Sequence, residues 1–218
     1  KWRVPDPVAA APASGTPAGA RASLLHPELL RLNAGIFILH VLLYAMFVVV
    51  PPLLVDAGLD LSQHWKLYLP VLLASFVLMV PAILYADRRN QPKPVLLGAV
   101  ALLVVVEAVL AATNAGIATL GALMLGFFVA FNVLEAMLPS LVSRMAPEHG
   151  RGVAIGVYNT TQTLGVFCGG LIGGWVARHH GPGGVFYMCA GLAAVWLALA
   201  SRMRPAVRAV NGLSNAAL

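Results

Sequence analysis

Charged residues are scarce in this chain of 218 residues, because Asp, Glu, Lys and Arg together make up only 10% of it. Soluble domains carry about 25% charged residues. Hydrophobic residues make up 60% of the chain, and the mean hydropathy is +0.85. This composition excludes an ordinary soluble domain and indicates a membrane protein before any single residue is considered.

Cysteine is also scarce, since Cys168 and Cys189 are the two in the chain and both lie within apolar runs. Two such cysteines provide neither a disulfide framework nor the spacing of metal ligands. We therefore expect no metal site and no cofactor.

Motifs for chemistry inside a membrane are lacking as well. An intramembrane protease needs a Ser/His pair or paired Asp residues within the bundle, yet no Gly-x-Ser elbow precedes the serines in or near the apolar runs. These serines are Ser75, Ser140, Ser143 and Ser201. No carbonyl-filter sequence of the kind found in ion channels is present either. We therefore do not expect an enzyme, and we keep an intramembrane enzyme and a non-transporting six-helix membrane subunit only as alternative functions.

What the sequence does contain is long apolar runs, and a transmembrane helix needs about 20 such residues to cross about 30 Å. Six runs are long enough for transmembrane helices: Leu30–Val55, Trp65–Ala86, Pro94–Thr113, Ile117–Met145, Arg151–His179 and Gly184–Met203. Strands are not expected, because an open sheet edge cannot face lipid. The short links predict antiparallel neighbours. The fold class is therefore all-α, a polytopic membrane protein with six transmembrane helices over residues 28–204.

The two ends of the chain differ from this core. Residues 1–27 are rich in Ala, Pro, Gly and Ser and have no periodic apolar face, which predicts a flexible cytoplasmic linker. Residues 205–218 are expected to form a cytoplasmic tail. Because no Met precedes Met46, we expect a fragment or a processed product of a longer chain.

The basic residues predict the orientation of the bundle. Most of them fall on the side of the N-terminus: Lys1, Arg3, Arg21, Arg31, Arg88, Arg89, Lys93, Arg144, Arg151, Arg202, Arg204 and Arg208. Only Lys66 and Arg178 fall on the other side. Cytoplasmic loops collect Lys and Arg, so both termini are expected in the cytoplasm. The net charge of +6 then reflects topology in a lipid bilayer, and no nucleic-acid partner is expected because no binding motif is present.

Three stretches carry a family resemblance. "LYADRRNQPK", Leu84–Lys93, resembles the cytoplasmic loop signature of the major facilitator superfamily. Its residues Asp87, Arg88 and Lys93 match the signature, whereas Ile83 and Asn90 stand where glycines are usual. The Gly-rich stretch Arg151–Val176 resembles the eleventh helix of drug-efflux members. The third stretch is "GIFILHVLLYAMFVVVPPLL", Gly35–Leu54, taken with "HWKLYLP" at 64–70 and "FFVAFNVLEAMLPSLVSR" at 127–144. Together these stretches are similar to the YajR-type proton-coupled efflux transporters of bacterial inner membranes.

The resemblance implies that this chain is the C-terminal six-helix half of a twelve-helix fold, built from two inverted three-helix repeats. The partners it implies are a small-molecule substrate, protons and the missing N-terminal six-helix half. In the family, the first helix of each repeat lines the central cavity, the second faces the other half and the third packs outside. The Asp and Arg of the loop signature tie helix ends together, so Asp87, Arg88 and Lys93 form either a gating loop or a plain positively charged loop.

Polar residues inside the spans need a use or a partner, because an ionisable group at the centre of an inserting helix costs about 2.5–3.5 kcal/mol. Asn132 and Glu135 are three apart, and His40 and Tyr44 are four apart, so each pair shares a helix face. In the family frame both pairs lie on cavity helices, which predicts a cluster around a water-filled path with Glu135 as proton carrier. The alternatives are that Asn132 and Glu135 only hydrogen-bond a neighbouring helix, and that His40 is a satisfied core histidine. Because Lys and Arg occur only near the ends of the predicted spans, amphiphilic substrates are favoured over phosphates.

Two further groups have alternative interpretations. Glu107 is expected to be a structural partner or a snorkelling carboxylate near the periplasmic end, with proton relay as the alternative. Gly165, Gly169 and Gly173 follow a polar belt that includes Asn159 and Gln162. Small residues let membrane helices approach closely, so this helix is predicted to be either a tight packing surface or a gate that slides against the missing half.

Overall fold

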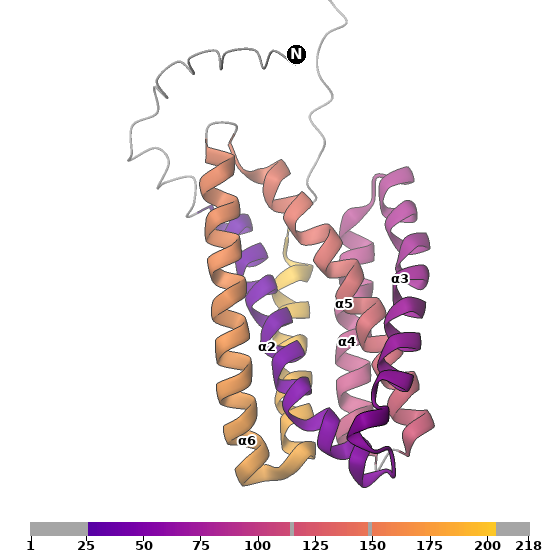
Figure 1. Ribbon diagram of the computed structural model, residues 1–218. Coiled ribbons are helices and arrows are strands. Elements are labelled where there is room, and N and C mark those ends of the chain that lie inside the picture. Colours follow the sequence, from indigo (N-terminus) through magenta and orange to yellow (C-terminus); the bar gives the residue numbers. More distant parts are fainter. Residues whose placement is uncertain (1–25, 114–115, 148–149, 204–218) are drawn as a thin grey trace, which may run out of the picture.

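The computed structural model describes residues 26–113, 116–147 and 150–203 (Figure 1), and within them it contains helices and no strand. The predicted linker and the tail at 205–218 lie outside the described residues, apart from His26 and Pro27. The elements are α2 (Pro27–Asp56), the short η1 (Leu61–Gln63), α3 (Trp65–Arg88), α4 (Pro92–Ala112), α5 (Ile117–Met145) and α6 (Arg151–Ser201).

The helix boundaries follow from local sequence. α2 begins at Pro27, earlier than predicted, because proline suits the first helical position, where its missing N–H is not needed. The preceding His26 accepts a hydrogen bond from the backbone N–H of Glu28 at its Nδ1, at 3.3 Å. α3 ends in a left-handed residue, Asn90, at φ 51°. The N–H of Gln91 donates to the carbonyl of Ala86 at 2.9 Å and that of Asn90 to Asp87 at 3.2 Å, which is a Schellman motif.

The element α6 joins two predicted helices, Arg151–His179 and Gly184–Met203. It runs for 51 residues and has one non-helical residue, Gly181, with φ 70° and ψ −178°. A positive φ is readily adopted by glycine, and Pro182 follows it. In Figure 1 the orange part of α6 runs down the left of the bundle and the yellow part returns behind α2. We call residues 151–180 the first arm and residues 182–201 the second arm.

Contacts with α2 show the direction of each arm. A Cβ on Gly165 would meet Phe37, and one on Gly173 would meet Ala45, so the first arm runs parallel to α2. Near the beginning of α2, a Cβ on Gly35 would lie 2.8 Å from Nε1 of Trp196, so the second arm returns antiparallel. The break at Gly181 therefore reverses the chain.

The described residues contain five helices long and apolar enough to cross a membrane, with α6 taken as one. α2 is the most enclosed, with 56% of its most apolar window buried, whereas only 11% of the corresponding window of α3 is buried. α3 packs mainly against α5 and presents Leu73, Phe76 and Val77 outward, each more than half exposed. A polytopic membrane protein accommodates such a surface against lipid or against another helical unit.

Candidate functional site

Gln162 of the first arm joins His40 of α2 to Glu135 of α5. Its Nε2 lies 2.8 Å from Nε2 of His40 and donates a hydrogen bond of 3.3 Å to Oε1 of Glu135. The other carboxylate oxygen of Glu135 lies 3.9 Å from Nε2 of His40. One amide therefore connects the two ionisable side chains and three separate elements of the bundle.

The other ring nitrogen of His40 fixes its tautomer. Nδ1 lies 3.1 Å from the carbonyl oxygen of Ile36, and because a carbonyl can only accept, Nδ1 carries the proton. Nε2 of the neutral ring is then an acceptor, which suits the N–H of Gln162. The second N–H of the same amide donates to Oε1 of Glu135. This set of bonds fits a neutral His40 beside a carboxylate oxygen that accepts.

Exposure differs sharply between the two ionisable side chains. The side chain of His40 is 6% exposed, whereas that of Glu135 is 34% exposed. His40 is therefore part of the packed core, while Glu135 reaches the surface of the described bundle. Water can therefore reach the side chain of Glu135 but not that of His40.

Asn132 and Tyr44 do not belong to this hydrogen-bonded group. Asn132 donates to Oγ of Ser75 on α3 at 2.8 Å, and Tyr44 is 39% exposed with its ring 6.3 Å from that of Phe47. Residues three apart are separated by about 60° around a helix, so Asn132 and Glu135 reach different neighbours. The predicted four-residue cluster is therefore divided, with His40 and Glu135 together and Asn132 joining α5 to α3.

Tyr158 is a neighbour of the site that the sequence analysis missed. It is 2% exposed, and its hydroxyl has no hydrogen-bond partner in the described part of the chain. Oε2 of Glu135 likewise has no hydrogen-bond partner there. Tyr158 precedes Gln162 by four residues, so a helical wheel would have placed both on one face.

Aromatic rings connect this site to an apolar pocket. The ring of His40 lies 5.7 Å from that of Phe131, Phe131 stacks on Phe127, and Phe127 contacts Phe128 at 5.5 Å. Edge-to-face and offset arrangements of this kind are favourable. The rings form a continuous apolar wall along α5 that leads from His40 to the pocket.

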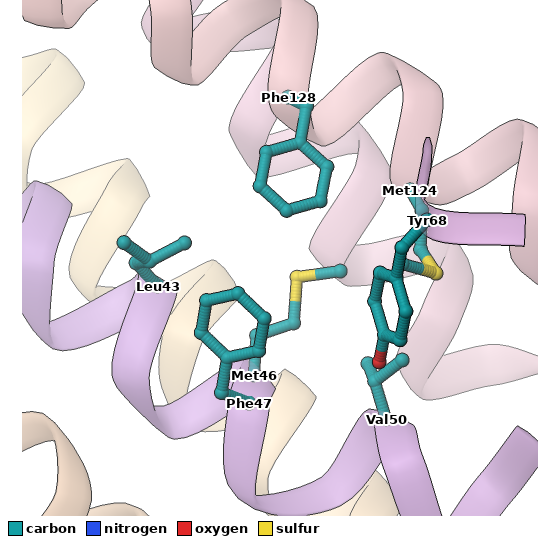
Figure 2. A pocket seen from close by; sticks show the side chains of 7 residues that line it. All are labelled: Leu43, Met46, Phe47, Val50, Tyr68, Met124 and Phe128. Carbon is teal, nitrogen blue, oxygen red and sulfur yellow. The ribbon is translucent and has the colours of Figure 1, made fainter. Parts of the chain in front are cut away.

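Figure 2 shows the pocket, which lies between α2, α3 and α5. It is lined by Leu43, Met46, Phe47, Val50, Tyr68, Met124 and Phe128. Its cavity volume is about 10 Å³, which is room for about one water molecule. The hydroxyl of Tyr68 points toward Val50 (Figure 2) and has no hydrogen-bond partner among the described residues. The pocket is thus nearly filled by flexible and aromatic side chains.

The glycines of the first arm pack against α2. A Cβ on Gly165 would lie 2.5 Å from the carbonyl oxygen of Phe37, one on Gly169 would lie 2.6 Å from that of Val41, and one on Gly173 would lie 2.7 Å from Cα of Ala45. This is the tight packing surface of the first interpretation, and because α2 occupies it, this face is not free to slide against another half. Asn159 is exposed, and its carbonyl accepts from Thr163.

The predicted gating loop makes two kinds of contact. Asp87 lies 3.9 Å from Arg144, with both side chains well exposed. Lys93 donates from Nζ to the carbonyls of Ser201 at 2.7 Å and Met203 at 2.6 Å. Arg88 is exposed. Lys93 therefore binds the end of α6, whereas Asp87 and Arg144 join the ends of α3 and α5.

Glu107 was expected to be a structural partner or a snorkelling carboxylate, with proton relay as the alternative, and the snorkelling interpretation is wrong. Its side chain is fully enclosed, with 0% exposure, so it cannot extend to the membrane surface. Within the described ranges, no group of three or more His, Cys, Asp or Glu side chains is placed to hold a metal ion.

A family model and the similar proteins both identify one family for this chain. A family model of the Major Facilitator Superfamily matches residues 32–217. The inner membrane transport protein YajR of Escherichia coli strain K12 is 46% identical over 183 residues, which cover 83% of this chain and 40% of that protein. The uncharacterized transporter BU466 of Buchnera aphidicola is 30% identical over 146 residues, covering 67% of this chain and 37% of that protein. The chain thus spans about two fifths of the length of the curated relatives it matches.

Proposed function

This chain belongs to the Major Facilitator Superfamily, and from that premise we propose that it is one six-helix half of a transporter that moves small molecules outward across the bacterial inner membrane in exchange for protons. The hydrogen bonds of Gln162 with His40 and Glu135 are the observation that carries the proposal. It provides an ionisable group with access to water and connects that group to three elements.

The six spans follow if the two arms of α6 cross the membrane separately. At about 1.5 Å per residue, the second arm alone matches the thickness of about 30 Å that a hydrocarbon core requires. Two three-helix units then result, the first over α2, α3 and α4 and the second over α5 and the two arms. The end that holds Arg31, Lys93 and Arg144 is the cytoplasmic side under the positive-inside rule.

Proton loading changes which bonds this site can make. In the arrangement described, His40 accepts at Nε2 and Glu135 accepts at Oε1, and Gln162 supplies both N–H groups. A proton on Nε2 turns it into a donor, so it loses its bond with the Gln162 nitrogen and gains an attraction to Glu135 across the 3.9 Å gap. A proton on Glu135 turns one of its oxygens into a donor as well. Either event alters the bonds between α2, α5 and the first arm, which is how proton binding is coupled to helix movement.

The substrate class follows from the surroundings of the carboxylate. The wall of Phe131, Phe127 and Phe128 extends from His40 to the pocket in Figure 2. Phe127 and Phe128 are buried in that wall, whereas the ring of Phe131 is half-buried. A partly exposed carboxylate together with the ring of Phe131 suits an amphiphilic molecule whose polar or cationic part lies near Glu135 and whose apolar part lies against that ring. Proton and substrate then compete for the same carboxylate, as exchange requires.

A second six-helix unit is the partner that the outer surface of this chain supports. Phe76 and Val77 on α3 and Leu164 and Phe167 on the first arm are each more than half exposed. These residues would face the other half and the lipid around it, and the path for substrate would lie between the two halves.

The test replaces Glu135 by Gln in the complete transporter reconstituted in vesicles. We expect substrate-driven proton movement to disappear while the amount and fold of the inserted protein are unchanged, because Gln keeps the shape of the side chain but cannot exchange a proton. Asp60→Asn, in the loop before η1, is the matched control and should leave exchange intact. Undiminished proton-coupled efflux in Glu135→Gln would refute the proposed role.

A further inference from the structure

Glu107 of α4 is a fully enclosed carboxyl group outside the site described above. It is 0% exposed, and neither of its oxygens has a hydrogen-bond partner in the described part of the chain. An isolated carboxylate is costly in an apolar interior, so a carboxyl group in this setting is held as the neutral acid. A side chain that served packing alone would not need an acid here.

The neighbours of Glu107 come from two other elements. The thiol of Cys189 on the second arm, itself 0% exposed, is close enough to interact electrostatically with the carboxyl group. On the α5 side, a Cβ on Gly126 would lie 3.1 Å from Val106, the residue before Glu107. Cys189 is thus a titratable neighbour of Glu107, and it is uncharged while it remains a thiol.

A vestibule opens at the end of the bundle opposite Arg31 and Arg202. It has a cavity volume of about 450 Å³ and is lined by the ends of α2 and α4, the start of α5 and the region after the break in α6. Asp56 and Thr113 supply polar groups to its lining. Water can therefore reach into the bundle at this end.

The floor of the vestibule separates this water from Glu107. Leu110 and Phe186 are part of the lining, and they are 4% and 2% exposed. Leu110 lies three residues after Glu107 on α4, and Phe186 lies three residues before Cys189 on the second arm. Three residues correspond to a rise of about 4.5 Å along a helix, so less than one turn of α4 separates Leu110 from Glu107. The same length of the second arm separates Phe186 from Cys189.

The second arm begins at this vestibule. Gly181 has a φ of 70°, and Pro182 and Gly183, which follow it, line the cavity. Phe186 lies five residues after this break. Because glycine tolerates a wide range of backbone angles, a small rotation of the second arm at Gly181 would move Phe186 away from Leu110 and admit water to Glu107.

We propose that Glu107 is a second proton-binding site, separate from Glu135, which exchanges its proton with water in the vestibule when Phe186 moves. The chemical step is the transfer of one proton between a water molecule of the vestibule and a carboxylate oxygen, and no other bond changes. Asp56 at the rim holds a negative charge where protons arrive. Glu107 lies on α4 and would receive water from the vestibule, whereas His40, Glu135 and Gln162 lie on other elements. This second site therefore goes beyond the proposed function and does not depend on it.

The test is chemical labelling of the neutral acid by a water-soluble carbodiimide with an amine nucleophile, which converts a carboxyl group into an amide. The chain is held in lipid nanodiscs, labelled over a series of pH values and analysed by peptide mass spectrometry. We expect labelling at Glu107 that decreases as pH rises, since the carbodiimide needs the protonated acid. Glu107→Gln provides the unlabelled reference.

Two matched variants test the access path. Phe186→Ala removes the floor of the vestibule and should raise the labelling rate of Glu107 several-fold, whereas Leu103→Ala removes a fully buried side chain one turn to the other side of Glu107 and should not. Phe186→Leu, a milder change, should give an intermediate rate if Phe186→Ala folds poorly.

Absence of label at Glu107 in all these variants, or equal rates in Phe186→Ala and Leu103→Ala, would overturn the proposal and leave Glu107 as a sealed structural acid. Because the readout is labelling at one residue, its outcome is independent of whether Glu135→Gln abolishes transport.

Discussion

The side-chain nitrogen of Gln162 lies 2.8 Å from Nε2 of His40, so the first arm of α6 is bonded to α2 at the depth of Glu135. Because the same nitrogen also serves Glu135, replacing Gln162 by Leu should leave two acceptors without donors. In the complete transporter we expect coupled efflux to fall by about tenfold, the effect of about 1.4 kcal/mol on a rate, with a changed ratio of protons to substrate. That ratio is measured in vesicles. Asn159→Leu, an exposed change on the same arm, should keep the ratio of the unmodified protein, and an unchanged ratio in Gln162→Leu would contradict the coupling role.

Gly169 and Gly170 are adjacent, but substitution by Ala should affect the thermal unfolding midpoint differently at the two positions. A Cβ on Gly169 would lie 2.6 Å from the carbonyl oxygen of Val41, while one on Gly170 meets nothing within 4 Å. Forcing a methyl group into a packed interface costs about 1–3 kcal/mol, so Gly169→Ala should lower the thermal unfolding midpoint. Gly170→Ala should leave it unchanged or raise it slightly, because Ala favours helix over Gly. The midpoints are measured in the same detergent, and equal values would show that the close approach is not maintained.

Asn90 tests the loop signature. It holds a φ of 51° at the end of α3, and it stands where the family usually has glycine. Asn90→Gly should therefore preserve stability, whereas Asn90→Ala should cost about 1–2 kcal/mol, the penalty of the left-handed conformation for an ordinary residue. Thermal unfolding of both variants distinguishes them, and a stable Asn90→Ala would mean that the loop adopts another conformation.

The helices could be predicted from the sequence because their signals are local. Apolar runs bounded by prolines and charges gave the starts of α3, α5 and α6 at the correct residues. Pairing within the site could not be predicted, since His40 and Gln162 are 122 residues apart and Asn132 and Ser75 are 57 apart. Helical periodicity tells which residues share a face, but it does not tell which neighbouring helix that face will meet. For that reason the sequence predicts a packing surface or a gate for the helix of Gln162, and it groups Asn132 with Glu135.

The glycine contacts between the first arm and α2 also decide what can move. Backbone that lies within carbonyl contact over two turns cannot separate or rotate without opening voids, so α2 and the first arm must travel together as one rigid body. The backbones at His40 and Gln162 then keep a constant separation throughout a transport cycle, and the backbone at Glu135 on α5 is the one whose distance varies. The distance between two spectroscopic probes on α2 and α5 should accordingly change during the cycle, whereas the distance between probes on α2 and the first arm should stay constant.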